Sequence, residues 1–233
     1  MSHPVLELQA AETMSDQLKN RRQRLAEREQ VQAARNDLIR WNESRKLLHQ
    51  RLDELEKQVE QSEKESHDID RKRTKLEAQL KTVIAPREAE ALQSEIATLN
   101  ARRSELDDSE LVALEEQSRL EDELASVLGQ ERALTDTLTT ADTALAAAER
   151  DIDGELKGIA NRLDGLRSEV DKAVLKRYDR LRSHFVVAAT KLSGSRCEGC
   201  HLDLSAHEVD DVKDALAASG MADCPQCGRL LFG

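Results

Sequence analysis

The chain has 233 residues and a formal net charge of −11, with 35% charged and only 2% aromatic residues. This composition excludes a large globular core and is typical of long helices and coiled coils. The acidic balance argues against indiscriminate nucleic-acid binding, and no apolar run reaches the length of about 18 residues that a membrane span requires.

A first long helix is predicted to begin near Pro4, because proline suits the first turn of a helix. It contains no further proline and no glycine up to about Lys81. From Leu48 onward, alternating steps of four and three residues fall mostly on apolar side chains, which is the pattern of a coiled-coil seam. Trp41, the only tryptophan, falls on this seam, and we interpret it as a core residue rather than a binding residue.

Residues 82–87 interrupt the seam, and Pro86 is predicted to open a second helix. A second apolar seam follows over residues 92–152. Two long amphipathic helices joined by a short turn predict an all-α antiparallel coiled-coil hairpin over residues 1–170. Glycines weaken the second helix toward its end, and we expect it to break or bend near Gly165.

Residues 171–183 predict a short bridging helix that leads to a small α+β module of residues 184–233. This module buries too little apolar surface to fold alone, so a metal ion is expected to supply folding free energy. Its predicted elements are a strand at 185–190, a helix opened by a Ser205–Glu208 capping box and ending near Gly220, and a closing strand at 228–232.

The four cysteines of the chain all lie in this module, in two Cys-x-x-Cys pairs: Cys197, Cys200, Cys224 and Cys227. Two such pairs predict a tetrahedral set of four thiolates that binds one Zn²⁺. A redox dithiol would occur once, at a helix N-terminus in a βαβ context, and disulfides would need an oxidising compartment. Because four thiolates leave no position open for water or substrate, the predicted zinc is structural rather than catalytic.

His201 directly follows Cys200 and is either an additional contact to the metal or a surface residue near the site. We favour the surface position. The N-terminal sequence also lacks the basic and apolar segments of a signal peptide. Together with thiols in metal-binding spacing, this predicts a cytoplasmic protein.

The whole chain resembles a bacterial family of coiled-coil hairpin proteins with a C-terminal C4-type zinc ribbon. The resemblance is most specific at residues 197–204 and 224–231, and extends to the Pro86-Arg87-Glu88 opening and to the bridging helix around Tyr178. It implies non-enzymatic regulators that contact an alternative sigma factor or secretion and flagellar components, and at least one member type that binds messenger RNA. This chain has no basic tail before its last residue, Gly233, which argues against RNA binding.

One functional hypothesis is an adaptor that binds proteins. A long charged hairpin offers a large surface without a pocket for a small-molecule substrate, and we expect partner contacts at the zinc end or at the turn, where Arg87 lies. The protein is predicted to be a monomer or a weak dimer. No phosphate-binding loop, nucleophile motif or catalytic His–Cys pair appears, so an enzyme is not expected.

The alternative hypothesis is nucleic-acid binding by a local basic stretch beside the ribbon, near Tyr178 and Phe185. Residues 198–223 are strongly acidic, so the same basic side chains are equally expected to pair with the ribbon or to cap a helix end. The seven basic residues of this stretch are Lys172, Lys176, Arg177, Arg180, Arg182, Lys191 and Arg196.

Overall fold

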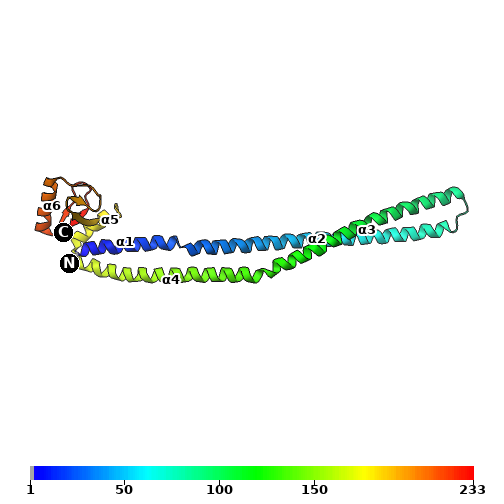
Figure 1. Cartoon of the computed structure of the whole chain (residues 1–233), viewed down its shortest axis with the longest axis horizontal. Helices are drawn as coiled ribbons and strands as arrows, with labels where there is room; N and C mark the ends of the chain where they lie inside the picture. The colour runs from blue at the N-terminus through cyan, green and yellow to red at the C-terminus, as the bar shows by residue number, and fades with distance from the viewer. Residues whose placement is uncertain (1–2) are drawn as a thin grey trace. The chain divides into compact units, whose positions relative to one another are not determined.

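The computed structural model describes residues 3–233 and divides into two compact units (Figure 1). One unit is Val31–Ala141, and the other combines the two ends of the chain, residues up to Gln30 and Asp142–Gly233. The fold is a long helical hairpin with a small strand-containing module at its C-terminal end, as the composition and the seams predict. No helix among residues 3–233 is both long and apolar enough to cross a membrane.

The unit Val31–Ala141 is an antiparallel pair formed by most of α2 (Ala26–Leu80) and by α3 (Pro86–Gly129). Pro86 occupies the first turn of α3, where its missing N–H costs no helical hydrogen bond. The seam is built as predicted, since Leu55 of α2 packs against Ala113 and Leu120 of α3 in a buried cluster. The predicted antiparallel helical hairpin is therefore confirmed, and the chain between Leu80 and Pro86 connects its two helices.

Two interruptions divide the long helices where continuous helices were expected. At the first, α1 (Pro4–Gln23) ends before α2 begins. At the second, Gln130 separates α3 from α4 (Glu131–Glu169). The indole N–H of Trp41 donates a 2.6 Å hydrogen bond to the carbonyl of Val127, in the last turn of α3, so this half-buried seam residue also caps a helix end.

The expected break near Gly165 is wrong, because α4 continues through it to Glu169. Glycine costs a helix interior about 1 kcal/mol relative to alanine. On the same helix, Leu166 next to this glycine and Ile152 earlier in the helix are 8% and 2% exposed, and burying an aliphatic side chain contributes about 1.5–3 kcal/mol. Seam burial outweighs the glycine penalty, and the helix ends instead where Asp171 caps the next one.

That next helix is α5 (Lys172–Arg182), which forms within the predicted bridging segment. It packs with α1, α4 and the ribbon in one hydrophobic core, to which Leu8, Leu166 and Tyr178 each contribute a buried side chain. Tyr178 is 0% exposed. The two ends of the chain thus share a core.

The ribbon is a four-stranded sheet in the order β2 (Arg196–Cys197), β1 (Ala189–Ser193), β4 (Leu230–Phe232) and β3 (Met221–Asp223). Strand β1 is parallel to β4, and the other neighbours are antiparallel. β4 is buried on both faces, because Leu230 and Phe232 enter the core with α1 and α5 while Leu231 enters a second core with the cysteines. The ribbon also contains one helix among the described residues, α6 (Ala206–Ser219).

The helix α6 has the predicted capping box at Ser205 and Glu208, and it ends at Gly220 with φ of 74°. The strand predicted at residues 185–190 begins only at Ala189, so that prediction was placed too early. The strand starts later because side chains bind the backbone just before it. Arg182 donates to the carbonyl of Val186, and Arg229 donates to the carbonyl of Val187. Strand pairing therefore starts at Ala189, four residues later than the apolar pattern indicates.

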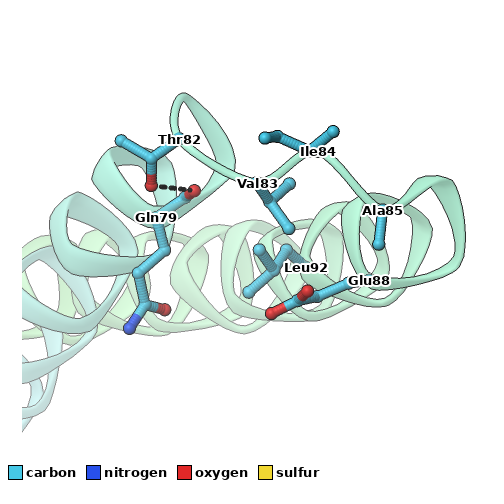
Figure 2. Close-up of a pocket in the computed structure, with 7 residues that line it drawn as sticks. All are labelled: Gln79, Thr82, Val83, Ile84, Ala85, Glu88 and Leu92. Carbon is cyan, nitrogen blue, oxygen red and sulfur yellow. Dashed lines mark hydrogen bonds between the residues drawn. The ribbon is translucent and has the colours of Figure 1, made fainter.

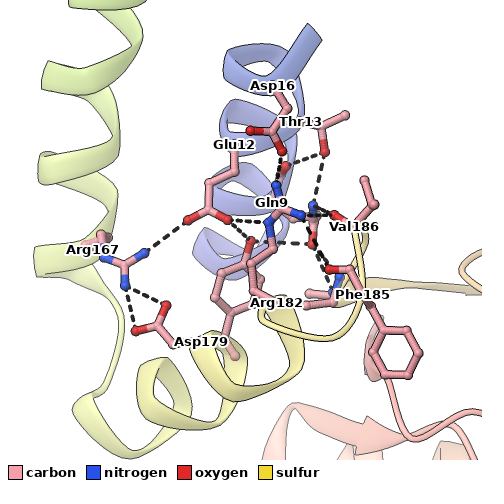
Figure 3. Close-up of polar contacts among 12 residues, drawn as sticks. Gln9, Glu12, Thr13, Asp16, Arg167, Asp179, Arg182, Phe185 and Val186 are labelled. Atoms are coloured by element: carbon pink, nitrogen blue, oxygen red, sulfur yellow. Dashed lines mark hydrogen bonds and ion pairs between the residues drawn. The ribbon is translucent and has the colours of Figure 1, made fainter. Parts of the chain in front are cut away.

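A single buried glutamine joins α1 to the start of the sheet (Figure 3). The Gln9 side chain is 5% exposed, and its carbonyl oxygen accepts from the backbone N–H groups of Ala188 at 2.6 Å and Ala189 at 3.2 Å. Its amide nitrogen donates to the carbonyl of Val186 at 3.1 Å and to the Thr13 hydroxyl at 3.0 Å. Gln9 thus satisfies backbone groups just before β1, at Val186 and Ala188, and the N–H of Ala189, the first residue of β1.

Replacing Gln9 with alanine should loosen the contact between α1 and the ribbon. The Gln9→Ala variant leaves the buried N–H groups of Ala188 and Ala189 without an acceptor, which should lower the free energy of unfolding of this unit by about 2–4 kcal/mol. Amide hydrogen exchange at these two residues measures the effect. Gln17→Ala, at an exposed position of the same helix, is the matched control, and equal exchange rates in the two variants would contradict the assigned role of Gln9.

Candidate metal centre

The two Cys-x-x-Cys segments adopt the same local conformation. In the first, the N–H of His201 donates to the carbonyl of Cys197 at 2.8 Å, and in the second the N–H of Gly228 donates to the carbonyl of Cys224 at 2.8 Å. The residue that follows each pair has a left-handed backbone, with φ of 61° at His201 and 72° at Gly228. Each tight turn thereby directs two sulfur atoms to one side of the chain.

The sheet brings the two turns together. The first turn follows β2 and the second connects β3 to β4, and all four sulfur atoms lie within 4.8 Å of one another. A tetrahedral zinc with Zn–S bonds of about 2.3 Å would hold its sulfur ligands about 3.8 Å apart, and the Cys200 and Cys224 sulfurs are 4.0 Å apart. The four sulfur donors therefore fit one structural Zn²⁺ and leave no ligand position for a substrate.

The surroundings of the thiols differ between the ligands. Burial raises the pKa of Cys197, and it raises that of Cys224 to about 12 against the hydrogen bonds from the N–H groups of Gln226 and Cys227. Burial also acts to raise the pKa of Cys227, but hydrogen bonds from the backbone and side chain of Arg229 reverse this and lower it to about 7. The buried thiols need a cation to ionise, which a bound metal supplies.

Gly199, inside the first turn, permits a close approach that the sequence does not reveal. An added Cβ at this position would lie 2.8 Å from the side chain of Arg229 and 3.1 Å from that of Thr190. Arg229 lies beside the turn because its guanidinium donates to the carbonyl of Val187 and stacks on the ring of Phe185 at 4.2 Å. Arg229 thus connects the second cysteine pair to the segment before β1. This structural role is visible only in the three-dimensional structure and has no signature in the sequence.

His201 is exposed and lies outside the cluster of four sulfurs. Its position agrees with the surface role favoured from the sequence. Its left-handed backbone is the conformation that glycine adopts at the equivalent position of the second turn.

Three of the seven predicted basic residues make ion pairs within the protein. Arg177 of α5 pairs with Asp223 of β3, and Arg196 pairs with Asp203 at 3.1 Å, so both contact carboxylates of the ribbon. The side chain of Arg182 is 20% exposed and binds Glu12 and Asp16 of α1 (Figure 3). These pairs match the alternative in which the basic stretch stabilises the fold.

The other four basic residues are exposed. Lys172, Lys176 and Arg180 are spaced four residues apart on α5 and share one helix face, whereas Lys191 lies on β1. Arg87, the residue proposed for partner contacts, is exposed in the first turn of α3. The structure therefore places the predicted basic residues on different parts of the chain's surface, and Arg182 alone among them is partly buried.

The left-handed positions predict opposite effects of two substitutions. His201→Gly should raise the free energy of unfolding of the ribbon by about 1 kcal/mol, because an L side chain is disfavoured at positive φ. Gly228→Ala should lower it by a similar amount of about 1 kcal/mol, although no atom lies within 4 Å of the added Cβ.

The free energies of unfolding of the two variants are compared by denaturant unfolding of the zinc-loaded proteins, with amide exchange in β4 as the readout. Zinc content should stay at that of the unmodified protein in both. A loss of zinc from the His201→Gly variant would show instead that this histidine is a ligand.

Comparison with known proteins identifies both parts of the chain. A family model described as a CT398-like coiled coil hairpin domain matches residues 8–185, and a C4-type zinc ribbon model matches residues 196–231. The uncharacterised protein Rv2229c of Mycobacterium tuberculosis is 29% identical over 206 residues, which cover 88% of this chain and 82% of the relative.

Three solved structures share the fold. A Mycobacterium smegmatis protein superposes with a TM-score of 0.82 at 23% identity, over 99% of this chain and 96% of its own. CT398 from Chlamydia trachomatis gives 0.81 at 19% identity, over 98% and 95% of the two chains. HP0958 from Helicobacter pylori gives 0.59 at 18% identity, over 99% and 95%. The chain belongs to the CT398-like coiled-coil hairpin family and ends in a C4-type zinc ribbon that binds one structural zinc ion.

Proposed function

We propose that the chain is a non-enzymatic cytoplasmic adaptor that binds proteins of a transcription or secretion-type regulatory system. In this proposal the hairpin (residues 1–170) reaches a partner through its turn, and the bridging helix (171–183) connects it to the zinc ribbon (184–233). The system is the one that the family resemblance implies. The support from this chain itself comes from the turn of the hairpin.

The turn between α2 and α3 exposes aliphatic side chains where polar turn residues would serve the fold equally well. Ile84 is 96% exposed, and Figure 2 shows it pointing away from the helices while Val83 points toward Leu92. An open hollow of about 540 Å³ lies beside them. Because an isoleucine in water contributes nothing to folding, the full exposure of Ile84 beside an open hollow supports the turn as a contact surface for another protein.

The same hollow gives little support to an enzyme. Its lining side chains are mostly aliphatic or neutral polar, and Glu88 is the one titratable residue among them. A lone carboxylate lacks the second group that general acid–base or nucleophilic catalysis needs. The cysteines, the other reactive groups, belong to the closed metal set.

A photo-crosslinking amino acid at position 84 tests the proposal in cells. It should capture a defined protein, whereas the same amino acid at Ala101, an exposed position of α3, should not. With that protein purified, Ile84→Asp should weaken binding by about tenfold and Ala101→Asp should not, since an apolar anchor contributes more than rim residues. Equal capture at both positions, or binding that Ile84→Asp leaves unchanged, would rule out the turn as the docking site.

Nucleic-acid binding is a second candidate, supported by the exposed basic face of α5 formed by Lys172, Lys176 and Arg180. The ion pairs of Arg177, Arg182 and Arg196 weigh against it, because they neutralise nearly half of the basic stretch. Titration with RNA and DNA at salt concentrations from about 50 to 200 mM distinguishes the two functions. Binding that is lost when the three α5 residues become alanine would favour this candidate over the adaptor.

A further inference from the structure

A small notch in the ribbon combines an apolar floor with an acidic rim. Its volume is about 140 Å³, and it lies between α6, β3 and the second cysteine turn. The floor consists of Val212, Ala215, Ala222 and Pro225, and the rim carries the carboxylates of Glu208, Asp211 and Asp223. The notch belongs to the ribbon and not to the turn of the hairpin, so a binding role for it goes beyond the proposed function.

The rim carboxylates are held in place by neighbouring groups. Glu208 accepts from the N–H of Ser205 at 2.8 Å and from the Gln226 amide at 2.7 Å. Asp211 contacts the His207 ring at 2.8 Å and Asp223 pairs with Arg177, each through Oδ2. Within residues 3–233, Oδ1 of Asp211 and of Asp223 has no hydrogen-bond partner, so each carboxylate can accept a further donor.

The volume of the notch and its carboxylates exclude several classes of ligand. Drug-sized ligands and cofactors fill about 300–1,000 Å³, which is more than this notch offers. Among residues 3–233, the cysteines are the one group of His, Cys, Asp and Glu side chains that converges closely enough for a metal ion, so the rim is not a cation site. The negative rim also disfavours nucleic acid.

A long side chain with an apolar stem and a cationic head matches both parts of the notch. The stem would cover the floor at Ala215 and Ala222, and the head would reach the free oxygens of Asp211 and Asp223. Arginine suits this better than lysine, because its planar guanidinium donates to two carboxylates at fixed angles. We propose that the notch binds an arginine side chain from a basic segment of a protein partner.

The chain itself offers a competing occupant. The exposed basic face of α5 (Lys172, Lys176 and Arg180) on a second copy could enter the same notch. Sedimentation of the full-length protein distinguishes this case. The proposal expects that the sedimentation coefficient does not depend on concentration, and self-association that Asp211→Asn abolishes would overturn it in favour of a dimer contact.

A labelled peptide with arginines separated by alanines is the probe for the full-length, zinc-loaded protein. The same peptide with neutral citrulline in place of arginine is its control. Fluorescence anisotropy at low salt should show binding of the arginine peptide only. Equal binding of the two peptides would contradict the proposal, because the rim then has no role.

Two adjacent residues of α6 provide a matched pair of variants. Asp211→Asn removes a rim carboxylate and Asp210→Asn removes the same charge from an exposed position that does not line the notch. Asp211→Asn should weaken peptide binding by about fivefold and Asp210→Asn by much less. Equal losses would show attraction by the whole acidic surface and would overturn the proposal.

Filling the notch tests the apolar floor independently. Ala215→Leu places a larger side chain on the floor and should weaken binding of the arginine peptide, although no charge changes. Zinc content and far-UV circular dichroism report whether the variant is folded. Unchanged binding by a folded Ala215→Leu protein would overturn the proposal as well.

Discussion

The convergence of four thiolates on one point is the constraint on which the ribbon depends. The cysteines come from two turns that are 24 residues apart at Cys200 and Cys224, and the sheet between them has strands of two to five residues. Strands this short contribute few ladder hydrogen bonds, so the metal must supply folding free energy that the sheet cannot. Buried thiols with raised pKa values also require a bound cation, which makes the ribbon core and the zinc site mutually dependent.

The strand β4 transmits this constraint to the helices. Its alternate side chains enter two different cores, so a displaced second cysteine turn would move Leu230 and Phe232 away from α1 and α5. Gln9 and Arg182 then fix the segment before β1 through its backbone carbonyls and N–H groups. Arg182, considered from sequence for nucleic acid, therefore contributes to the joint between α1 and the ribbon.

The hairpin, its turn and the zinc ligands could be predicted because each follows from local pattern. Each of these features is recognisable from residues close together in the sequence. They are an apolar seam with steps of three and four residues, Pro86 at a helix start and two Cys-x-x-Cys pairs. The helix interruption at Gln130 and the late start of β1 could not be predicted, because they depend on side chains from distant positions. Trp41 contacts Val127 and Gln9 contacts Ala188, and neither pair has a sequence signature.

The candidate contact surfaces also differ in how much of them the sequence reveals. Arg87 and the basic stretch are visible in the sequence, but which of these side chains remain unpaired is decided only by the fold. The apolar floor of the notch on α6 is likewise invisible in sequence, because Ala215 and Ala222 belong to different elements and look like ordinary small residues. Spatial arrangement, rather than residue type, distinguishes the proposed contact surfaces from the solvated charges around them.

We infer that zinc holds the ribbon folded, whereas the hairpin folds without zinc. The most direct test is amide exchange across the full-length protein before and after zinc removal, with Cys224→Ser as a genetic equivalent. We predict that protection at Leu231 and Ala222 is lost while protection at Leu55 and Leu120 in the hairpin core is retained. Full protection of the ribbon amides without zinc, or simultaneous loss of protection in both regions, would contradict this separate dependence on zinc.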